Sequence, residues 1–95
     1  MPSEINDITI AREEEGVEVI QELDKVVLSG GVWTTIIFKY RQWDRRKEGY
    51  SDDKFTIRRY KKFNDDYRQQ SKFNISSADQ ARKIIEALEG WLGSM

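Results

Sequence analysis

The sequence predicts an α+β fold in which a four-stranded antiparallel β-sheet is followed by one C-terminal α-helix packed on one face. Four stretches between Val17 and Ile75 are rich in β-branched and aromatic residues, as strands usually are. A last stretch, after Ser76, repeats its apolar residues at the spacing of a helix. A run of strands before a helix favours an antiparallel sheet with the helix on one side. Because the chain has 95 residues, we expect one domain with a modest core.

Residues 1–16 are predicted to form an acidic N-terminal arm, ahead of a single folded domain at residues 17–95. The arm ends in the acidic run Glu13–Glu15. Ile8 and Ile10 alternate with polar neighbours, so a short strand is an alternative for this segment. We interpret the arm as mobile and solvated. The alternative is that its negative charge mimics a nucleic acid and competes for the basic part of the chain.

The first two strands of the sheet are predicted at residues 17–29 and 32–44. Apolar residues of the first stretch also fit a helical period, but its β-branched content favours a strand, with a bend or bulge near Asp24. Gly30–Gly31 then provides a turn. The second strand alternates, and we assign one of its faces to the core: Thr34, Ile36, Phe38 and Tyr40.

The last two strands are predicted at residues 54–64 and 67–75, with a turn at Asn64–Asp66. Residues 45–53, which precede them, form a basic loop in this interpretation. Strand alternation separates the apolar residues from the basic ones in the first of these strands. The predicted core face, toward the helix, consists of Ile36, Phe38, Phe55, Ile57, Phe73 and Ile75.

The helix is predicted to begin at a capping box, Ser76–Asp79, and to end at Gly93 in the left-handed conformation. Its apolar stripe consists of Ala81, Ile84, Ile85, Leu88, Trp91 and Leu92. Simple packing on the sheet would account for the stripe. However, the stripe is longer than one small sheet face needs. We therefore expect a homodimer with a two-fold contact at the end of the helix: Leu88, Trp91 and Leu92.

Positive charge and aromatic rings are concentrated between Trp33 and Asn74. This stretch holds 12 of the 16 basic residues, although the whole chain has a net charge of −1. Strand alternation collects eight of these residues on the face away from the helix: Trp33, Lys39, Arg41, Trp43, Arg58, Tyr60, Lys62 and Lys72. The structural alternative is an ordinary solvated sheet face. Cations beside exposed rings suit a single-stranded nucleic acid, because phosphates pair with cations and unstacked bases lie on rings.

The composition argues against several other classes of protein. The chain has no Cys and no His, so we expect no disulfide, no metal site and no cofactor. The paired acids Asp52–Asp53 and Asp65–Asp66 lie in predicted turns, where aspartates usually bind backbone groups, so we do not expect an enzyme. No apolar stretch is long enough to span a membrane, and the first residues do not follow a signal-peptide pattern. The expected compartment is the cytoplasm.

Two short motifs in this order resemble those of the transcriptional coactivator positive cofactor four family, above all its small bacterial members. Phe55–Tyr60 is similar to the family's aromatic-x-Ile-Arg-x-aromatic strand. Ser71–Ser76, which runs into the capped helix, is similar to the end of its last strand. The resemblance covers roughly residues 17–92. By position, Arg58 and Tyr60 match the family's arginine and aromatic residue, and Lys72 replaces the family's glycine beside its basic residue.

The resemblance implies a homodimer that binds single-stranded or melted DNA with little sequence preference. It also implies a role in transcription or DNA metabolism, with the transcription machinery as a further partner. The residues themselves do not decide between DNA and RNA. Two alternatives stay open. One is a single-strand binder of the purine-rich-element-binding type. The other is a protein–protein interaction module that binds no nucleic acid.

Overall fold

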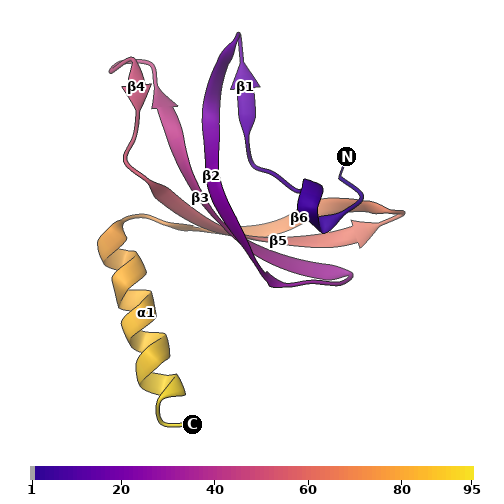
Figure 1. Cartoon of the computed structure of the whole chain (residues 1–95), viewed down its shortest axis with the longest axis vertical. Helices are drawn as coiled ribbons and strands as arrows, with labels where there is room; N and C mark the ends of the chain where they lie inside the picture. The colour runs from indigo at the N-terminus through magenta and orange to yellow at the C-terminus, as the bar shows by residue number, and fades with distance from the viewer. Residues whose placement is uncertain (1) are drawn as a thin grey trace.

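The computed structural model describes residues 2–95 and consists of one curled antiparallel sheet followed by one helix (Figure 1). In chain order the elements are the 3-10 helix η1 (Ile5–Asp7), the strands β1 (Arg12–Glu14), β2 (Val17–Ser29), β3 (Trp33–Asp44), β4 (Gly49–Tyr50), β5 (Lys54–Phe63) and β6 (Asp66–Ile75), and the helix α1 (Ala78–Leu92). The α+β class is therefore confirmed. The four long strands and the helix lie where they were predicted, but the short strands β1 and β4 raise the strand count above four.

The strands pair in the order β1-β2-β3-β5-β6, and β4 pairs separately with β3. All of these pairings are antiparallel. In β2 the register shifts between Glu22 and Asp24, which confirms the predicted bulge near Asp24. Another shift, in the pairing of β5 with β6, lies between Arg59 and Tyr60. Bulges of this kind increase the local twist, consistent with the curled shape of the sheet.

Two tight hairpins fix the ends of the sheet. Between β1 and β2, Glu15 and Gly16 have φ angles of 51° and 80°. Between β5 and β6, Asn64 and Asp65 have φ angles of 46° and 70°. Two consecutive residues with positive φ are characteristic of the turn whose twist matches that of paired strands. The β5–β6 hairpin therefore holds the neighbouring residue, Phe63, in a defined position.

One face of the sheet, the inner face, is covered by the N-terminal segment. Ile8 is 1% exposed. It belongs to a core cluster with Ile10, Ile36, Phe38, Tyr40, Tyr60 and Tyr67. Lys25 Nζ donates to the carbonyl oxygens of Asn6 and Ile8, and the amide of Tyr67 donates to the carbonyl of Pro2 at 2.8 Å. The expectation of a solvated arm is corrected accordingly: residues 2–14 supply core residues and the strand β1, and only Met1 of the predicted arm lies outside the described residues.

The inner face contains a different set of β5 and β6 residues from the one that we predicted. The β3 side is as expected, since Thr34, Ile36, Phe38 and Tyr40 are all buried. The register places Thr56 opposite Phe38 and Tyr60 opposite Thr34, so these β5 residues share the inner face. The predicted core residues Phe55, Ile57, Phe73 and Ile75 therefore lie on the opposite, outer face, where Ile75 alone is buried as predicted, at 6% exposed.

The helix α1 does not cover the sheet, contrary to the prediction. None of its residues is buried, and it runs away from the sheet after β6 (Figure 1). The molecule is only 17 Å thick along its shortest axis. The N-cap is Ser77, one residue later than predicted, and its hydroxyl accepts from the amide of Gln80 at 3.1 Å. Gly93 follows the helix with an ordinary φ of −65°, so the predicted left-handed end is wrong.

Candidate nucleic-acid interface

The eight predicted binding residues are divided between the two faces of the sheet. Four of them, all from β3, alternate with its buried residues and so lie on the outer face: Trp33, Lys39, Arg41 and Trp43. The other four lie on the inner face through the register of β5 and β6: Arg58, Tyr60, Lys62 and Lys72. The expectation of one face that combines all eight residues is therefore wrong.

The inner-face group has little surface on which a base could stack. Tyr60 is 6% exposed and belongs to the core, and burial raises the pKa of its phenol above the ordinary value. Arg58 donates from Nη1 to Gln69 Oε1 at 2.9 Å. Its Nε is buried without a hydrogen-bond partner within residues 2–95. Lys62 lies over the ring of Tyr67, 5.4 Å from its centroid. Lys72 is exposed, and the residue opposite it across the strands is Arg58.

On the outer face, Lys39 and Arg41 share one acidic partner. Arg41 Nε donates to Asp53 Oδ1 at 2.8 Å, and Lys39 Nζ lies 3.4 Å from Asp53 Oδ2. The hydrogen bond from Arg41, followed by the contact with Lys39, holds the pKa of Asp53 below its ordinary value. Both cations are therefore partly neutralised, which weakens their attraction for phosphate.

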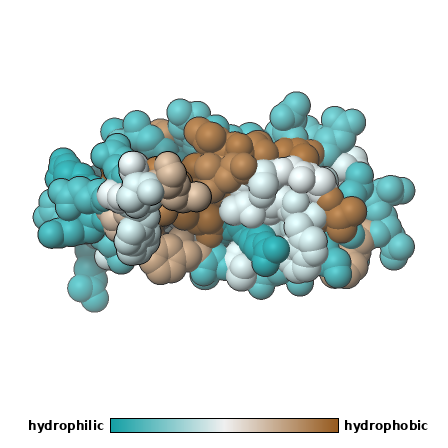
Figure 2. All heavy atoms as spheres, turned by 90° about the horizontal axis from the view of Figure 1, so that it is seen from below, coloured by the Kyte–Doolittle hydropathy of each residue, from teal (hydrophilic) through white to brown (hydrophobic). Residues whose placement is uncertain are grey.

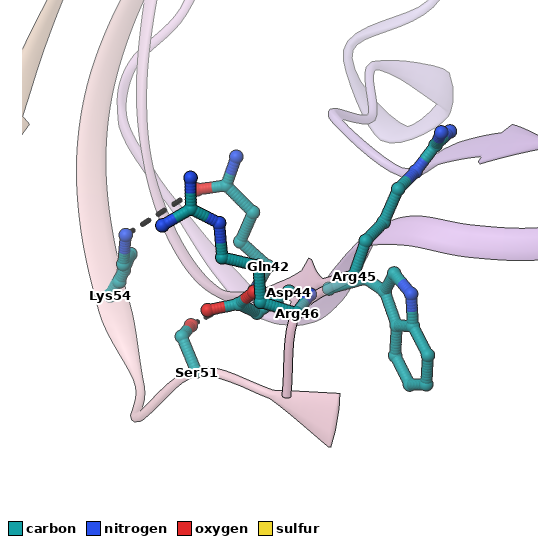
Figure 3. A pocket seen from close by; sticks show the side chains of 7 residues that line it. Gln42, Asp44, Arg45, Arg46, Ser51 and Lys54 are labelled. Carbon is teal, nitrogen blue, oxygen red and sulfur yellow. Dashed lines mark hydrogen bonds between the residues drawn. The ribbon is translucent and has the colours of Figure 1, made fainter. Parts of the chain in front are cut away.

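Trp43 and the basic loop form a separate region at the other end of β3. The Trp43 ring meets that of Tyr50 edge to face, with centroids 5.2 Å apart. A groove of about 500 Å³ lies beside it (Figure 3). Lys54 Nζ reaches Gln42 Oε1 across this groove, whereas Arg45 points away, toward Glu14 of β1 at 3.9 Å. Trp43 is thus used in local packing more than as an open platform.

The outer ends of β3, β5 and β6 carry a row of alternating cations and rings, which we name the Trp33 cluster. Its members, in spatial order, are Arg59, Trp33, Lys61, Phe63 and Arg68. Arg59 Cζ lies 4.2 Å from the Trp33 ring centroid. Lys61 Nζ lies 5.2 Å from the Trp33 centroid and 5.2 Å from that of Phe63. Arg68 Cζ completes the row at 5.8 Å from Phe63. These distances are typical of cation–π contacts.

The three cations of the Trp33 cluster are free to attract an anion. Within residues 2–95, neither Arg59 nor Lys61 nor Arg68 forms an ion pair, although acidic residues occupy the nearby β5–β6 turn. The rings also keep open surface, since Trp33 is 40% exposed and Phe63 37%. Open rings held among unpaired cations provide both kinds of contact that a single strand requires.

Most of this cluster was missed by the sequence analysis. Only Trp33 was among the predicted residues. The odd-numbered residues of β5 lie on one face of the strand, which was assigned to the core because of Phe55 and Ile57. That face also carries Arg59, Lys61 and Phe63. The available signal was the pairing of Trp33 with Lys61 across neighbouring strands, but the register of that pair depends on the whole β3–β5 ladder.

The remaining outer face and the helix leave apolar surface uncovered in the single chain. Phe73 is 52% exposed, and along α1 the exposed fractions are 49% for Leu88, 69% for Trp91 and 62% for Leu92. Figure 2, which views the molecule from below Figure 1, shows a band of hydrophobic atoms between hydrophilic ends. Apolar surface of this extent usually marks a contact with another molecule.

Comparison with known protein families, with curated proteins and with solved structures finds no match to this chain. The resemblance to the positive cofactor four family therefore stays a prediction. Within residues 2–95, no helix is long and apolar enough to cross a membrane.

Proposed function

We propose that this protein binds single-stranded nucleic acid, with DNA as the expected ligand, through the Trp33 cluster on the outer face of its sheet. The observation that supports the proposal is a row of three cations, which form no ion pair within the described residues 2–95, alternating with two open rings. Such a row offers charge to phosphates and flat apolar surface to bases, and neither contact depends on which base is present. Binding with little sequence preference, in transcription or DNA metabolism, is the function that follows.

A single strand suits this site better than a duplex does. In a duplex the faces of the bases are stacked on each other, so Trp33 and Phe63 would meet only backbone and groove edges. In a single strand the base faces are accessible, and stacking on an aromatic side chain is worth roughly 1–3 kcal/mol per base. The charge contribution is available to both ligands, so the rings determine the preference.

Fluorescence anisotropy tests the proposal with one labelled oligonucleotide, offered as a single strand and as a duplex of the same length. We expect tighter binding of the single strand and a fall in affinity as salt increases, because phosphate contacts release counterions. Equal or tighter binding of the duplex would contradict the role of the rings. If neither form binds, the proposal fails and a protein–protein interaction module becomes the better interpretation.

A matched pair of lysine variants identifies the face of the sheet that binds. Lys61→Met removes the central cation of the Trp33 cluster, and Lys72→Met removes an exposed cation from the inner face. Lys61→Met should weaken binding. It should also reduce the slope of the logarithm of the binding constant against the logarithm of the salt concentration by about 1, the value for one lost phosphate contact. Lys72→Met should leave both quantities almost unchanged. The reverse result would move the site to the inner face.

We also propose that two copies of the chain associate through the apolar stripe of α1. The stripe and the bare outer face cannot meet within one chain, because α1 runs away from the sheet (Figure 1). Two-fold symmetry allows Leu88, Trp91 and Leu92 of one copy to meet the same residues of the other. The exposed apolar stripe of α1 in one copy can then be buried against the same stripe in the other copy, and burying apolar surface is favourable.

Light scattering tests the dimer, with Trp91→Glu as the disruptive variant and Lys83→Glu as its control. Lys83 is exposed and lies outside the apolar stripe, so this control introduces the same side chain, with a larger change in net charge, on a polar side of the helix. We expect a dimeric wild type, a dimeric control and a monomeric Trp91→Glu. A wild type that is monomeric at tens of micromolar, well above the Kd of a specific dimer, would exclude the dimer. A dimeric Trp91→Glu would move the interface away from the helix end.

A further inference from the structure

We infer that the Trp33 cluster holds two consecutive nucleotides, with one base on Trp33, the next base on Phe63 and the phosphate that links them at Lys61. This inference rests on the proposed function and specifies the ligand of the same site. The ligand would be a dinucleotide step whose two bases are unstacked from each other, within a single strand of any sequence.

The order of groups along the cluster matches the order of groups along a single strand. The cluster runs cation, ring, cation, ring, cation, and a strand runs phosphate, base, phosphate, base, phosphate. Lys61 is equally distant from both rings, at 5.2 Å from each centroid, so the two rings lie no more than twice that distance apart. A phosphate at the central ammonium can therefore have one base on each side. Arg59 and Arg68 then lie at the positions of the two outer phosphates.

The two rings are held in place before a ligand arrives. Arg59 lies 4.2 Å from the Trp33 centroid, and Trp33 itself pairs directly with Lys61 across the strands. Phe63 ends β5 immediately before the tight β5–β6 turn, and it is flanked by Lys61 and Arg68. Side chains that are already ordered lose less conformational freedom on binding.

The central cation suits a linking phosphate. The ammonium of Lys61 is a compact charge with three donors, so it can contact a phosphate without requiring one fixed orientation. The guanidinium groups of Arg59 and Arg68 present planar forks, which match two oxygens of a single phosphate. In this arrangement the donors of Arg59, Lys61 and Arg68 are engaged with phosphates, and the two rings contact only the faces of the bases, so the site should tolerate any sequence.

The test compares thymidine carrying a phosphate on both its 5′ and 3′ oxygens with the thymidine dinucleotide carrying a phosphate at both ends. The protein is Trp43→Phe/Trp91→Phe, which leaves Trp33 as the single tryptophan of the chain's three and makes its fluorescence the reporter. Both ligands should quench Trp33 when they are titrated into the millimolar range. The dinucleotide should bind at least about fivefold more tightly, which corresponds to the lower end of the stacking free energy of one base.

Phe63→Leu, made in the same single-tryptophan protein, tests the contribution of the second base to affinity separately from that of the first. It keeps apolar volume but removes the ring, so the difference between the two ligands should fall by about the fivefold expected for one stacked base and leave only the contribution of the dinucleotide's extra phosphate, because base stacking needs the flat face. Phe73→Leu is the control, because Phe73 is an exposed outer-face ring outside the cluster. This control should keep the full difference between the ligands, and unchanged urea midpoints for both variants show that the fold is intact.

Anisotropy with a thymidine dodecamer distinguishes the failure of this inference from the failure of the proposed function. If the dodecamer binds as a single strand but the dinucleotide does not quench Trp33, or if Phe63→Leu leaves the difference between the ligands unchanged, the two-nucleotide arrangement is overturned and the proposed function stands. If the dodecamer does not bind at all, both are overturned. The arrangement is supported if the dinucleotide quenches Trp33 and if the ratio of the affinities of the two ligands falls in Phe63→Leu but not in Phe73→Leu.

Discussion

The basic residues of the outer face differ mainly in whether an acid lies beside them. Lys39 and Arg41 share Asp53, whereas Lys61 and Arg59 lie against aromatic rings. A cation–π contact leaves the formal charge uncompensated, and an ion pair does not. A basic residue in the sequence is therefore not equivalent to positive charge available on the surface. At this scale the binding site follows from the partners of each cation rather than from the number of cations.

Asp53 should make folding stability depend on acid pH. Its two cationic partners hold its pKa below the ordinary value, so its contribution to stability is present above that value and is lost as the pH falls through the lowered pKa. We expect Asp53→Asn to have a lower urea midpoint than the wild type at neutral pH. The difference should narrow as the pH falls below the lowered pKa, where the wild-type carboxyl is also neutral. A difference that stays constant with pH would mean that the ion pair is not its source.

Tyr60 should make stability depend on alkaline pH. Burial raises its pKa above the ordinary value of 10.0, so the folded state keeps a proton that the unfolded state releases. The contribution of Tyr60 to stability is then fully present below the pKa of the unfolded state. It is lost as the pH rises through the pKa of the folded state. Tyr60→Phe cannot ionise, and we expect its urea midpoint to fall less between about pH 8 and pH 11 than that of the wild type. An equal fall in both proteins would assign the effect to other groups.

Much of the element order could be predicted from the sequence. β-Branched and aromatic residues between turn residues indicate the four strands β2, β3, β5 and β6, and the spacing of apolar residues indicates the helix α1. The short strands β1 and β4 could not be predicted in the same way. They exist because tight turns bring a few polar residues against a long neighbouring strand, and such pairs have no pattern of their own.

The assignment of faces failed in β5 for an identifiable physical reason. Both parities of this strand contain aromatic or aliphatic residues, Phe55 and Ile57 on one side and Tyr60 on the other. The register with β3 and the N-terminal isoleucines determine which side is buried, and both are long-range effects. Because the candidate site lies on the parity that was assigned to the core, the site could not be found without this register.

The N-terminal segment should contribute to stability as a core element. Ile8 is 1% exposed among aromatic side chains, so Ile8→Ala leaves a cavity and should lower the free energy of unfolding by about 2–5 kcal/mol. Thr9→Ala provides the control at the next, exposed position, and should change stability much less. Urea unfolding at neutral pH measures both. Wild-type stability in Ile8→Ala would restore the interpretation of this segment as a solvated arm.

The start of α1 can be located by a pair of serine variants. Ser77 accepts from the Gln80 amide and is the N-cap, so Ser77→Ala should cost roughly 0.5–2 kcal/mol of stability. Ser76 is not the cap, and its hydroxyl only donates to the side chain of Gln80 at 2.9 Å. Ser76→Ala should therefore cost less. If Ser76→Ala is the more destabilising variant, the helix begins where the sequence predicted it.

At the scale of the whole molecule, the chain is a single curled layer with one covered face. The proposed dimer would use α1, and the Trp33 cluster lies at the far end of β5 from α1. From Phe55, near the helix, to Lys61 the strand rises roughly 20 Å. The nucleic-acid site and the dimer contact therefore do not compete for the same surface, and one dimer would present two clusters.

Two clusters on one dimer should make affinity depend on oligonucleotide length. A strand that is long enough to reach both clusters binds the second one at a high effective concentration, so its affinity should rise well beyond the statistical factor. We expect a step in affinity along a series of thymidine oligomers, measured by anisotropy. The monomeric Trp91→Glu variant should not show this step. A smooth rise in both proteins would indicate that each cluster acts alone.

The packing of Ile8 against Tyr60 and Tyr67 also sets an order of events during synthesis. The N-terminal segment leaves the ribosome first, but its binding surface is incomplete until β5 and β6 have been made. At about 5–20 residues per second, that delay lasts several seconds. This segment can therefore take its place on the sheet only after β5 and β6 have been made. Because contacts between residues so distant in the chain have a high cost in loop closure, we expect this protein to fold more slowly than small helical domains of the same length.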